Sequence, residues 1–218
     1  MTHQPQPTTD TSGVIKFLAQ IISYLFHPIF IPVYVIAFIS HVHPTMLAGF
    51  DEGQKQYLVL IIVLNLVFYP LLSTLLLKAV GFIDSIFLHS KKDRIIPLIA
   101  CGIFYFWCYT VFKEQDQYPR EIPAFVLGIF LASSAALMAN IYFKISLHAI
   151  GAGGLLGFFM MLQYKTESTM HWPLAAAVLI AGLICSSRLF LGAHSGKEVY
   201  LGLLLGIAAQ PVGFYIVL

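Results

Sequence analysis

Long apolar stretches alternate with short polar ones along the whole chain. Each apolar stretch is close to the roughly 20 residues that a helix needs to cross the hydrocarbon core of a bilayer. Only helices and closed barrels satisfy their own backbone in lipid, and no ten-residue alternating pattern typical of a barrel strand appears. We therefore predict an all-α membrane bundle of about seven transmembrane helices. The apolar runs cover residues 14–40, 57–80, 95–112, 124–143, 147–164, 172–191 and 199–218.

The composition supports an integral membrane protein. Hydrophobic residues make up 59% of the 218 residues, charged residues make up 10%, and the mean hydropathy is +0.84. A soluble domain has too little interior to bury such a sequence. We predict a polar tail over residues 1–13, followed by one transmembrane domain over residues 14–218. The first apolar run is too long for the core of a cleaved secretion signal, so no cleaved targeting peptide is expected. A net charge of +2 gives no indication of nucleic-acid binding.

Prolines and glycines predict local features of several helices. His27-Pro28 in the first run and Tyr69-Pro70 in the second predict kinks, because proline removes a backbone hydrogen bond. Small residues in the fifth and seventh runs have spacings that let neighbouring helices approach closely, which favours a packing role. These residues are Gly151, Gly153, Gly154, Gly157, Gly202 and Gly206.

Seven crossings divide the connections into two sets on opposite faces of the membrane. The first face holds the amino terminus and the links after the second, fourth and sixth runs, and it carries an excess of basic residues. The tendency of Lys and Arg to stay in the cytoplasm is one explanation. However, the basic residues cluster at helix ends beside histidines and hydroxyls in three links, which also predicts an anion site, with phosphate as the obvious anion. The basic residues of this face are Lys16, Lys78, Lys91, Lys92, Arg94, Lys144, Arg188 and Lys197.

The strongest cluster lies between the sixth and seventh runs. Glu198 follows His194 by four residues, so on a helix the carboxylate and the imidazole share a face and can hydrogen-bond. Such a pair fixes the tautomer and raises the basicity of the other ring nitrogen, as a nucleophilic histidine requires. Gly192 and Gly196 predict a turn that folds Arg188 back toward His194, where its guanidinium can bind a phosphate oxygen.

A second cluster opens the fifth run. Ser146 is a candidate helix cap, and the free N–H groups of a first helical turn favour an anion. His148 faces the same anion in this interpretation, with Lys144 beside it. A lone histidine at a helix start is more often a packed interfacial residue, so the prediction depends on the neighbouring lysine and on the shared face.

These residues resemble the type 2 phosphatidic acid phosphatases, a superfamily of metal-independent lipid phosphatases. The resemblance spans roughly residue 91 to the carboxyl terminus, with the motifs in residues 91–198. The third motif of that superfamily, Ser-Arg, five residues, His, three residues, Asp, is matched with Glu in place of Asp by Ser187, Arg188, His194 and Glu198. The second motif, Pro-Ser-Gly-His, keeps the serine and the histidine in Ile145, Ser146, Leu147 and His148. The first motif, Lys, six residues, Arg-Pro, is matched poorly: Phe87 stands at the lysine position, and the nearest residues are Lys91, Lys92, Arg94 and Pro97.

The resemblance implies a reaction and a role for each residue. His194 would be the nucleophile, Glu198 its orienting carboxylate, and His148 the general acid toward the leaving group. Neither a metal nor another cofactor is implied. The substrate would be amphiphilic, such as a polyprenyl diphosphate, phosphatidate or phosphatidylglycerophosphate, with its tails between helices. The implied substrate-binding residues are Arg188, Ser146, Lys144, Arg94, Lys92 and Lys91.

Two other function classes stay open. A polyprenyl transferase also places phosphate at a membrane edge, but it needs paired aspartates for magnesium, and Asp84 and Asp93 are isolated. A transporter, or a non-catalytic relative that binds an anionic lipid or phosphate, is compatible with Leu147 and with the weak first motif. The orientation is open as well, because charge predicts a cytoplasmic first face whereas bacterial members of the superfamily mostly expose this chemistry outside the cytoplasm.

Overall fold

The fold is an all-helical bundle. A computed structural model describes residues 9–88, 90–165 and 171–218, and within these ranges there are no strands. The polar tail predicted over residues 1–13 lies outside the described residues as far as residue 8, and the first helix begins at Thr9. The helices are α1 (Thr9–Leu25), α2 (Ile31–His41), α3 (Glu52–Val63), α4 (Tyr69–Ala79), α5 (Lys91–Lys113), α6 (Glu121–Tyr142), α7 (Leu147–Lys165), α8 (Trp172–Phe190) and α9 (Gly196–Val217).

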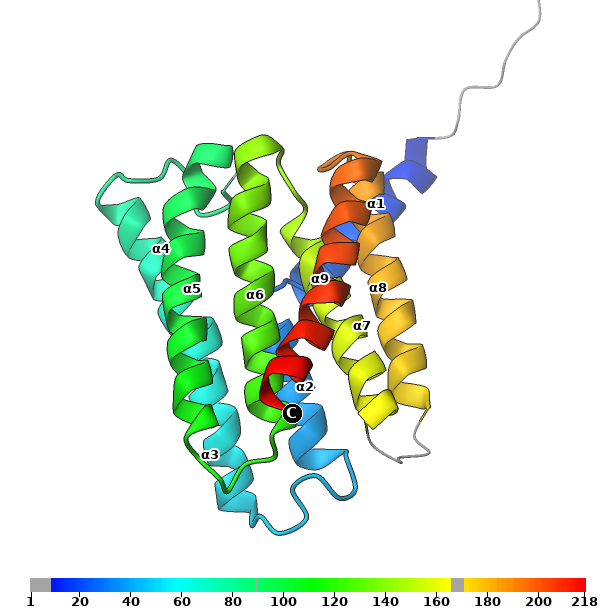
Figure 1. Cartoon of the computed structure of the whole chain (residues 1–218). Helices are drawn as coiled ribbons and strands as arrows, with labels where there is room; N and C mark the ends of the chain where they lie inside the picture. Colours follow the sequence, from blue (N-terminus) through cyan, green and yellow to red (C-terminus); the bar gives the residue numbers. More distant parts are fainter. Residues whose placement is uncertain (1–8, 89, 166–170) are drawn as a thin grey trace, which may run out of the picture.

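Six of the predicted crossings are helical segments long and apolar enough to span a bilayer. One is the continuous stretch Glu52–Ala79, which joins α3 to α4, and the others are α5, α6, α7, α8 and α9. They run roughly parallel and antiparallel through the bundle (Figure 1). The arrangement confirms the predicted fold class, a polytopic helical membrane protein.

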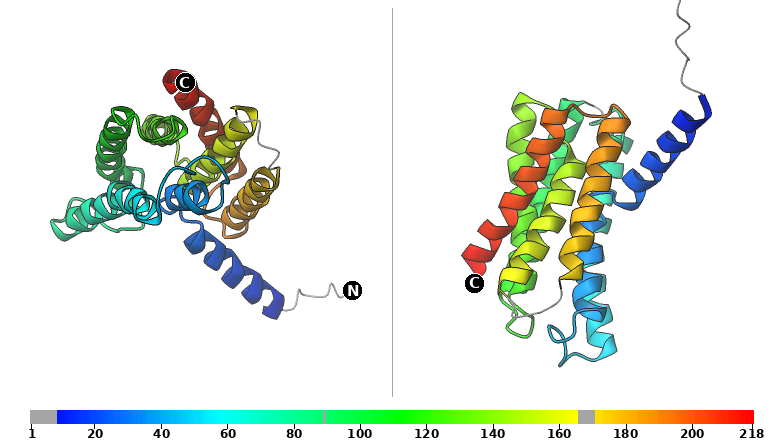
Figure 2. Two further views of the ribbon diagram at one scale, coloured as in Figure 1. Left: turned by 90° about the horizontal axis from the view of Figure 1, so that it is seen from below. Right: turned by 90° about the vertical axis from the view of Figure 1, so that its right-hand side faces the viewer.

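The first apolar run is divided into two short helices rather than one kinked helix. α1 ends at Leu25 and α2 begins at Ile31, so residues 26–30 form a break. Pro28 has no N–H to continue α1, and it disfavours a helical conformation at the preceding residue, His27. α1 leans away from the other helices and α2 continues into the bundle (Figure 2).

The second run stays continuous through its proline. A π-helical turn, Leu64–Phe68, connects α3 to α4 immediately before Tyr69-Pro70. A wider turn of this kind accommodates a residue that cannot donate to the helical ladder. The second predicted irregularity is therefore a local widening of the helix.

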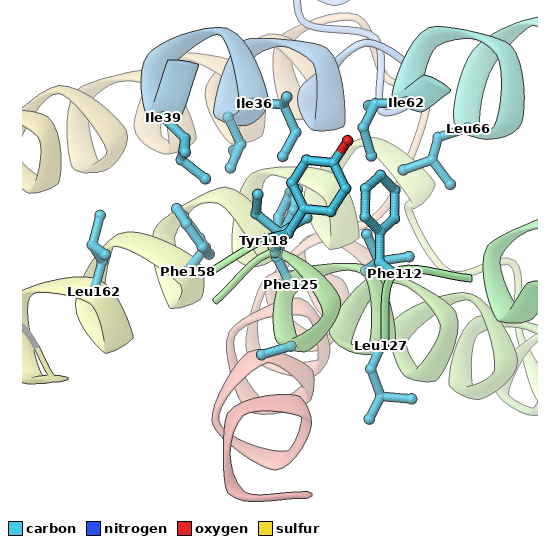
Figure 3. Packing of buried hydrophobic residues seen from close by; sticks show 14 of the residues in the cluster. Ile36, Ile39, Ile62, Leu66, Phe112, Tyr118, Phe125, Leu127, Phe158 and Leu162 are labelled. Atoms are coloured by element: carbon cyan, nitrogen blue, oxygen red, sulfur yellow. The ribbon is translucent and has the colours of Figure 1, made fainter. Parts of the chain in front are cut away.

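Close helix crossings and large apolar side chains hold the bundle together. α9 packs along both α7 and α6. At the α7–α9 crossing, a methyl group added at Gly202 would lie 2.8 Å from the carbonyl oxygen of Ser146, so only glycine permits this approach. This confirms the predicted packing role. The core beside this crossing joins α2, α3, α5, α6 and α7 through side chains that include Ile36, Ile62, Phe112, Phe125 and Phe158 (Figure 3).

Candidate functional site

The predicted site residues come from three links at one end of the bundle. The links α4–α5, α6–α7 and α8–α9 lie at the same end as the start of α1, shown at the top of Figure 1. This is the first face expected from the alternation of crossings. The C-terminus and the α5–α6 link lie at the opposite end.

His194 and Glu198 meet through a helix cap. Ser195 is the N-cap of α9, and its side chain and that of Glu198 form a capping box at the start of the helix. The Oε2 atom of Glu198 accepts from the backbone N–H of Ser195 at 2.9 Å and lies 3.3 Å from Nδ1 of His194. His194 therefore precedes the helix instead of sharing a continuous helical face with Glu198. One carboxylate caps α9 and orients the imidazole, so Nε2 is the ring nitrogen left for chemistry.

Arg188 is brought toward His194 by the turn that follows α8. Gly192 has a φ of +61°, which favours glycine, and the N–H of Ala193 bonds back to the carbonyl of Arg188 at 3.2 Å. Gly196 does not contribute to this turn, since it is the first residue of α9. The guanidinium of Arg188 donates from one terminal nitrogen to Oγ of Ser23 at 3.3 Å. Its Nε atom is buried and has no hydrogen-bond partner within the described part of the chain.

Ser146 links α7 to α9 at this end of the bundle. It is fully buried, its N–H donates to the carbonyl of Glu198 at 3.2 Å, and its Oγ accepts from the N–H of Ala149 at 3.4 Å. The side chain thus caps α7. Lys144, two residues earlier, is half-buried.

His148 is the second residue of α7 and lies against the break between α1 and α2. Its Nε2 is 3.1 Å from the carbonyl oxygen of Ser23, near the end of α1. Because a carbonyl can only accept, Nε2 carries the proton and Nδ1 is the nitrogen available for proton transfer. The ring of His27 stands edge-on to that of His148, with centroids 5.0 Å apart.

The break is seated on α7 by a second contact on the same helical face. Gly151 follows His148 by one turn, and a methyl group added there would lie 2.9 Å from Cβ of Pro28. Ser23, near the end of α1, and His27, in the break, also belong to this cluster, and neither was among the predicted site residues. The only sequence signal for them was His27-Pro28, which predicted a kink and not a contribution to a site.

The basic residues of the first motif lie at the start of α5, and two of them bind backbone carbonyls. Arg94 is buried and donates from Nε to Leu88 at 3.1 Å and from a terminal nitrogen to Ile145 at 2.7 Å. It therefore lies beneath the α6–α7 link and not at an exposed rim. The ammonium of Lys91 is 3.3 Å from the carbonyl oxygens of Ile141 and Tyr142 at the end of α6. Lys92 is exposed.

The electrostatics of the cluster favour an anion. Burial lowers the pKa of His194, and the positive charges of Arg94 and Arg188 lower it further, while the hydrogen bond and charge of Glu198 oppose the shift. Burial also lowers the pKa of Lys144, with Arg94 and Arg188 again adding to the effect and Glu198 opposing it. The positive charges of Arg94, Arg188 and Lys144 thus lie near a single carboxylate, that of Glu198, and they disfavour further protonation of the cluster. A phosphate group would relieve that repulsion.

No protein-family model, curated protein or solved structure matches the chain.

Proposed function

We propose that the protein is a metal-independent membrane phosphatase related to the type 2 phosphatidic acid phosphatases. It would hydrolyse the phosphate or diphosphate of an amphiphilic substrate through a phosphohistidine intermediate at His194. We propose the bacterial cytoplasmic membrane as its location. A polyprenyl diphosphate, phosphatidate or phosphatidylglycerophosphate fits a site at the end of a membrane bundle.

The observation that carries the proposal is the pairing of His194 with Glu198 beside Arg188. The carboxylate occupies Nδ1, so the Nε2 lone pair is directed away from it. Burial and the nearby arginines lower the pKa of His194, which favours the neutral ring that a nucleophile requires. The buried Nε–H of Arg188, which lacks a partner within the described residues, is a donor of the kind that phosphate oxygens accept.

The first step forms a bond between Nε2 of His194 and phosphorus and breaks the bond from phosphorus to the leaving oxygen. His148, protonated at Nδ1, gives its proton to that oxygen. The carboxylate of Glu198 stabilises the positive charge that develops on the His194 ring. In the second step, water attacks the phosphohistidine, His148 takes up the water proton, and Nε2 leaves with its electron pair. Phosphate is released and both histidines return to their starting states.

Phosphate release from a panel of lipid phosphates and diphosphates tests the proposal directly. The purified protein in detergent should release phosphate and, with a ³²P-labelled substrate, accumulate acid-labile label on quenching. His194→Ala should abolish both signals. His171→Ala is the matched control, because His171 is exposed and immediately precedes α8, which starts at the opposite end of the bundle (Figure 1). No release from any substrate, or label that persists in His194→Ala, would refute the proposed mechanism.

A second candidate function is the binding of an anionic lipid or phosphate without hydrolysis. Arg94 favours it, because two of its nitrogens already donate to the carbonyls of Leu88 and Ile145 and so serve the fold. Equilibrium dialysis with inorganic phosphate separates the two functions. Saturable binding that is lost in Arg188→Gln, with no phosphate release from any substrate, would favour this candidate.

A further inference from the structure

An apolar groove lies between α2, α7 and α8, beneath the candidate site. Its volume is about 170 Å³, and aromatic rings form much of its lining, among them Phe38 and Phe159. The rings of these two residues pack edge to face with centroids 5.1 Å apart. The lining also includes Tyr34 and Trp172, whose side chains are exposed, so the groove opens onto the outer surface of the bundle. A slot of this kind suits an apolar chain.

The break between α1 and α2 lies between the groove and the candidate site, because Pro28 packs on Gly151, one turn beyond His148 on α7. Phe26 lines the groove, and the next residue, His27, places its ring 5.0 Å from that of His148. Tyr34 holds the groove side of the break in place, since its hydroxyl donates to the carbonyl of Leu25 at 2.6 Å and its ring packs edge-on to Phe26. A molecule that places its headgroup at His148 therefore reaches the groove by laying its chain over the partly exposed break.

The distance of the groove from His148 follows from the spacing of residues along α7. Leu155 and Phe159 line it, and they follow His148 by seven and eleven residues. At about 1.5 Å of rise per residue, these positions lie roughly 10 to 17 Å along the helix axis from His148. An extended alkyl chain advances about 1.25 Å per carbon, given bonds of about 1.5 Å between carbons. Carbons from about the eighth to the thirteenth therefore reach the groove.

The volume limits how much of a chain fits. An apolar cavity of about 150 Å³ holds one benzene molecule, so about 170 Å³ holds six or seven carbons. This agrees with the stretch of carbons that the depth predicts. It leaves room for one chain and not for two side by side.

We propose that this groove binds the middle segment of a single apolar chain of the lipid phosphate whose headgroup lies at His194 and His148. The inference rests on the proposed function for the identity of the headgroup. It goes further by assigning the chain to the space between α2, α7 and α8. A second chain, where the substrate has one, stays in the surrounding lipid.

The first test fills the groove and compares two chain lengths. Ala176 lines the groove, while Ala175, the preceding residue on α8, is exposed and offers a matched control. Ala176→Phe should lower kcat/KM for dodecyl phosphate by at least about fivefold, roughly the loss from one or two chain CH₂ groups that are no longer buried, and leave butyl phosphate within about twofold. Ala175→Phe should change neither value. Equal losses on both substrates, or no loss on the longer one, would overturn the assignment.

The second test needs no turnover and therefore separates this inference from the proposed function. Dodecyl phosphate with a photoreactive diazirine at the tenth carbon is irradiated with the His194→Ala protein, and the labelled peptides are mapped by mass spectrometry. Label on α2, α7 or α8 at groove residues such as Phe159 or Trp172 is expected, reduced in Ala176→Phe. Label confined to other helices would overturn the inference even if phosphate is released. Equal groove labelling by the same chain without a phosphate would also overturn it, since the groove would then hold any membrane lipid.

Discussion

Replacing Glu198 by Gln removes a negative charge from the candidate site with little change in its geometry. Glutamine at the same position can still accept from the N–H of Ser195, because Gln serves as well as Glu in a capping box. The charged hydrogen bond to His194 at 3.3 Å becomes a neutral one. Glu198→Gln therefore tests the effect of the charge separately from the effect of the helix cap.

The expected loss of activity follows from the strength of that bond. A hydrogen bond to a charged group contributes about 1.5–3 kcal/mol, against about 1 kcal/mol for a neutral pair. Losing about 1–2 kcal/mol as the His194 ring becomes positive in the transition state lowers kcat by about 5- to 30-fold. The Glu198 side chain is 22% exposed, so solvent screens part of its charge and the lower half of this range is expected.

The assay is kcat at saturating lipid phosphate near pH 8, where His194 is neutral in both proteins. A matched control lies at the opposite end of the bundle, where Asp51 and Gln54 form a capping box at the start of α3 (Figure 1). Gln54→Ala breaks that box without touching the candidate site, and thermal unfolding of each variant reports its effect on the fold. An unchanged kcat in Glu198→Gln would refute the stabilising role of the carboxylate, and an equal loss in Gln54→Ala would attribute the effect to helix capping.

The same variant shifts the pH dependence in a defined direction. Burial lowers the pKa of His194, Arg94 and Arg188 add to the shift, and Glu198 opposes it. Because the neutral ring is the nucleophile, activity is present above the folded-state pKa and is lost as the pH falls through it. The acid limb of kcat/KM should therefore lie below about 6.5, the ordinary pKa of histidine, and should move to lower pH in Glu198→Gln. A limb above 6.5, or a move to higher pH, would contradict this account.

Three further predictions concern the leaving group, the helix crossing and metal dependence. His148→Ala should lower kcat by about 10²- to 10⁴-fold on an alkyl phosphate and much less on an activated aryl phosphate, measured by phosphate release, whereas equal losses would argue against general-acid catalysis. Gly206→Ala should destabilise the protein by about 1–3 kcal/mol in thermal unfolding, because the added methyl group meets the carbonyl of Ile150, while Gly182→Ala, with open space around it, should be neutral or slightly stabilising. Chelators of divalent metals should leave phosphate release unchanged and vanadate should inhibit it, whereas strict dependence on magnesium would favour the transferase alternative.

Hydropathy predicted most of the fold, because every segment that crosses lipid must be a long apolar helix that satisfies its own backbone. Six of the predicted runs are spanning helices in the structure, and the alternation of crossings placed three links at one end. The first run was the exception. Its residues stay apolar through Pro28, so hydropathy alone could not separate α1 from an α2 of only eleven residues. The division depends on backbone geometry at the proline, which a hydrophobicity profile does not contain.

The site was predictable where its contacts are local in sequence and not where they depend on tertiary packing. The contact of His194 with Glu198 follows from four residues of spacing and a helix start. One contact of Arg94 joins positions 51 residues apart, since its terminal nitrogen donates to the carbonyl of Ile145. A basic residue near a phosphate motif resembles a phosphate ligand in sequence, and only the packed structure shows that its donors also hold a backbone link.

The division of the first run into α1 and α2 was not predicted, and it accounts for a contact of the site that was not predicted either, the one between Ser23 and His148. A helix that ends leaves its last carbonyls without helical partners. The N–H of His27 bonds to the carbonyl of Tyr24, and the carbonyl of Ser23 accepts from His148 instead. If α1 continued straight into α2, that carbonyl would accept from the N–H of His27 within the helix and would be less available to Nε2 of His148. Pro28 thus acts on the tautomer of His148 from a different helix, through the backbone carbonyl group that the break makes available.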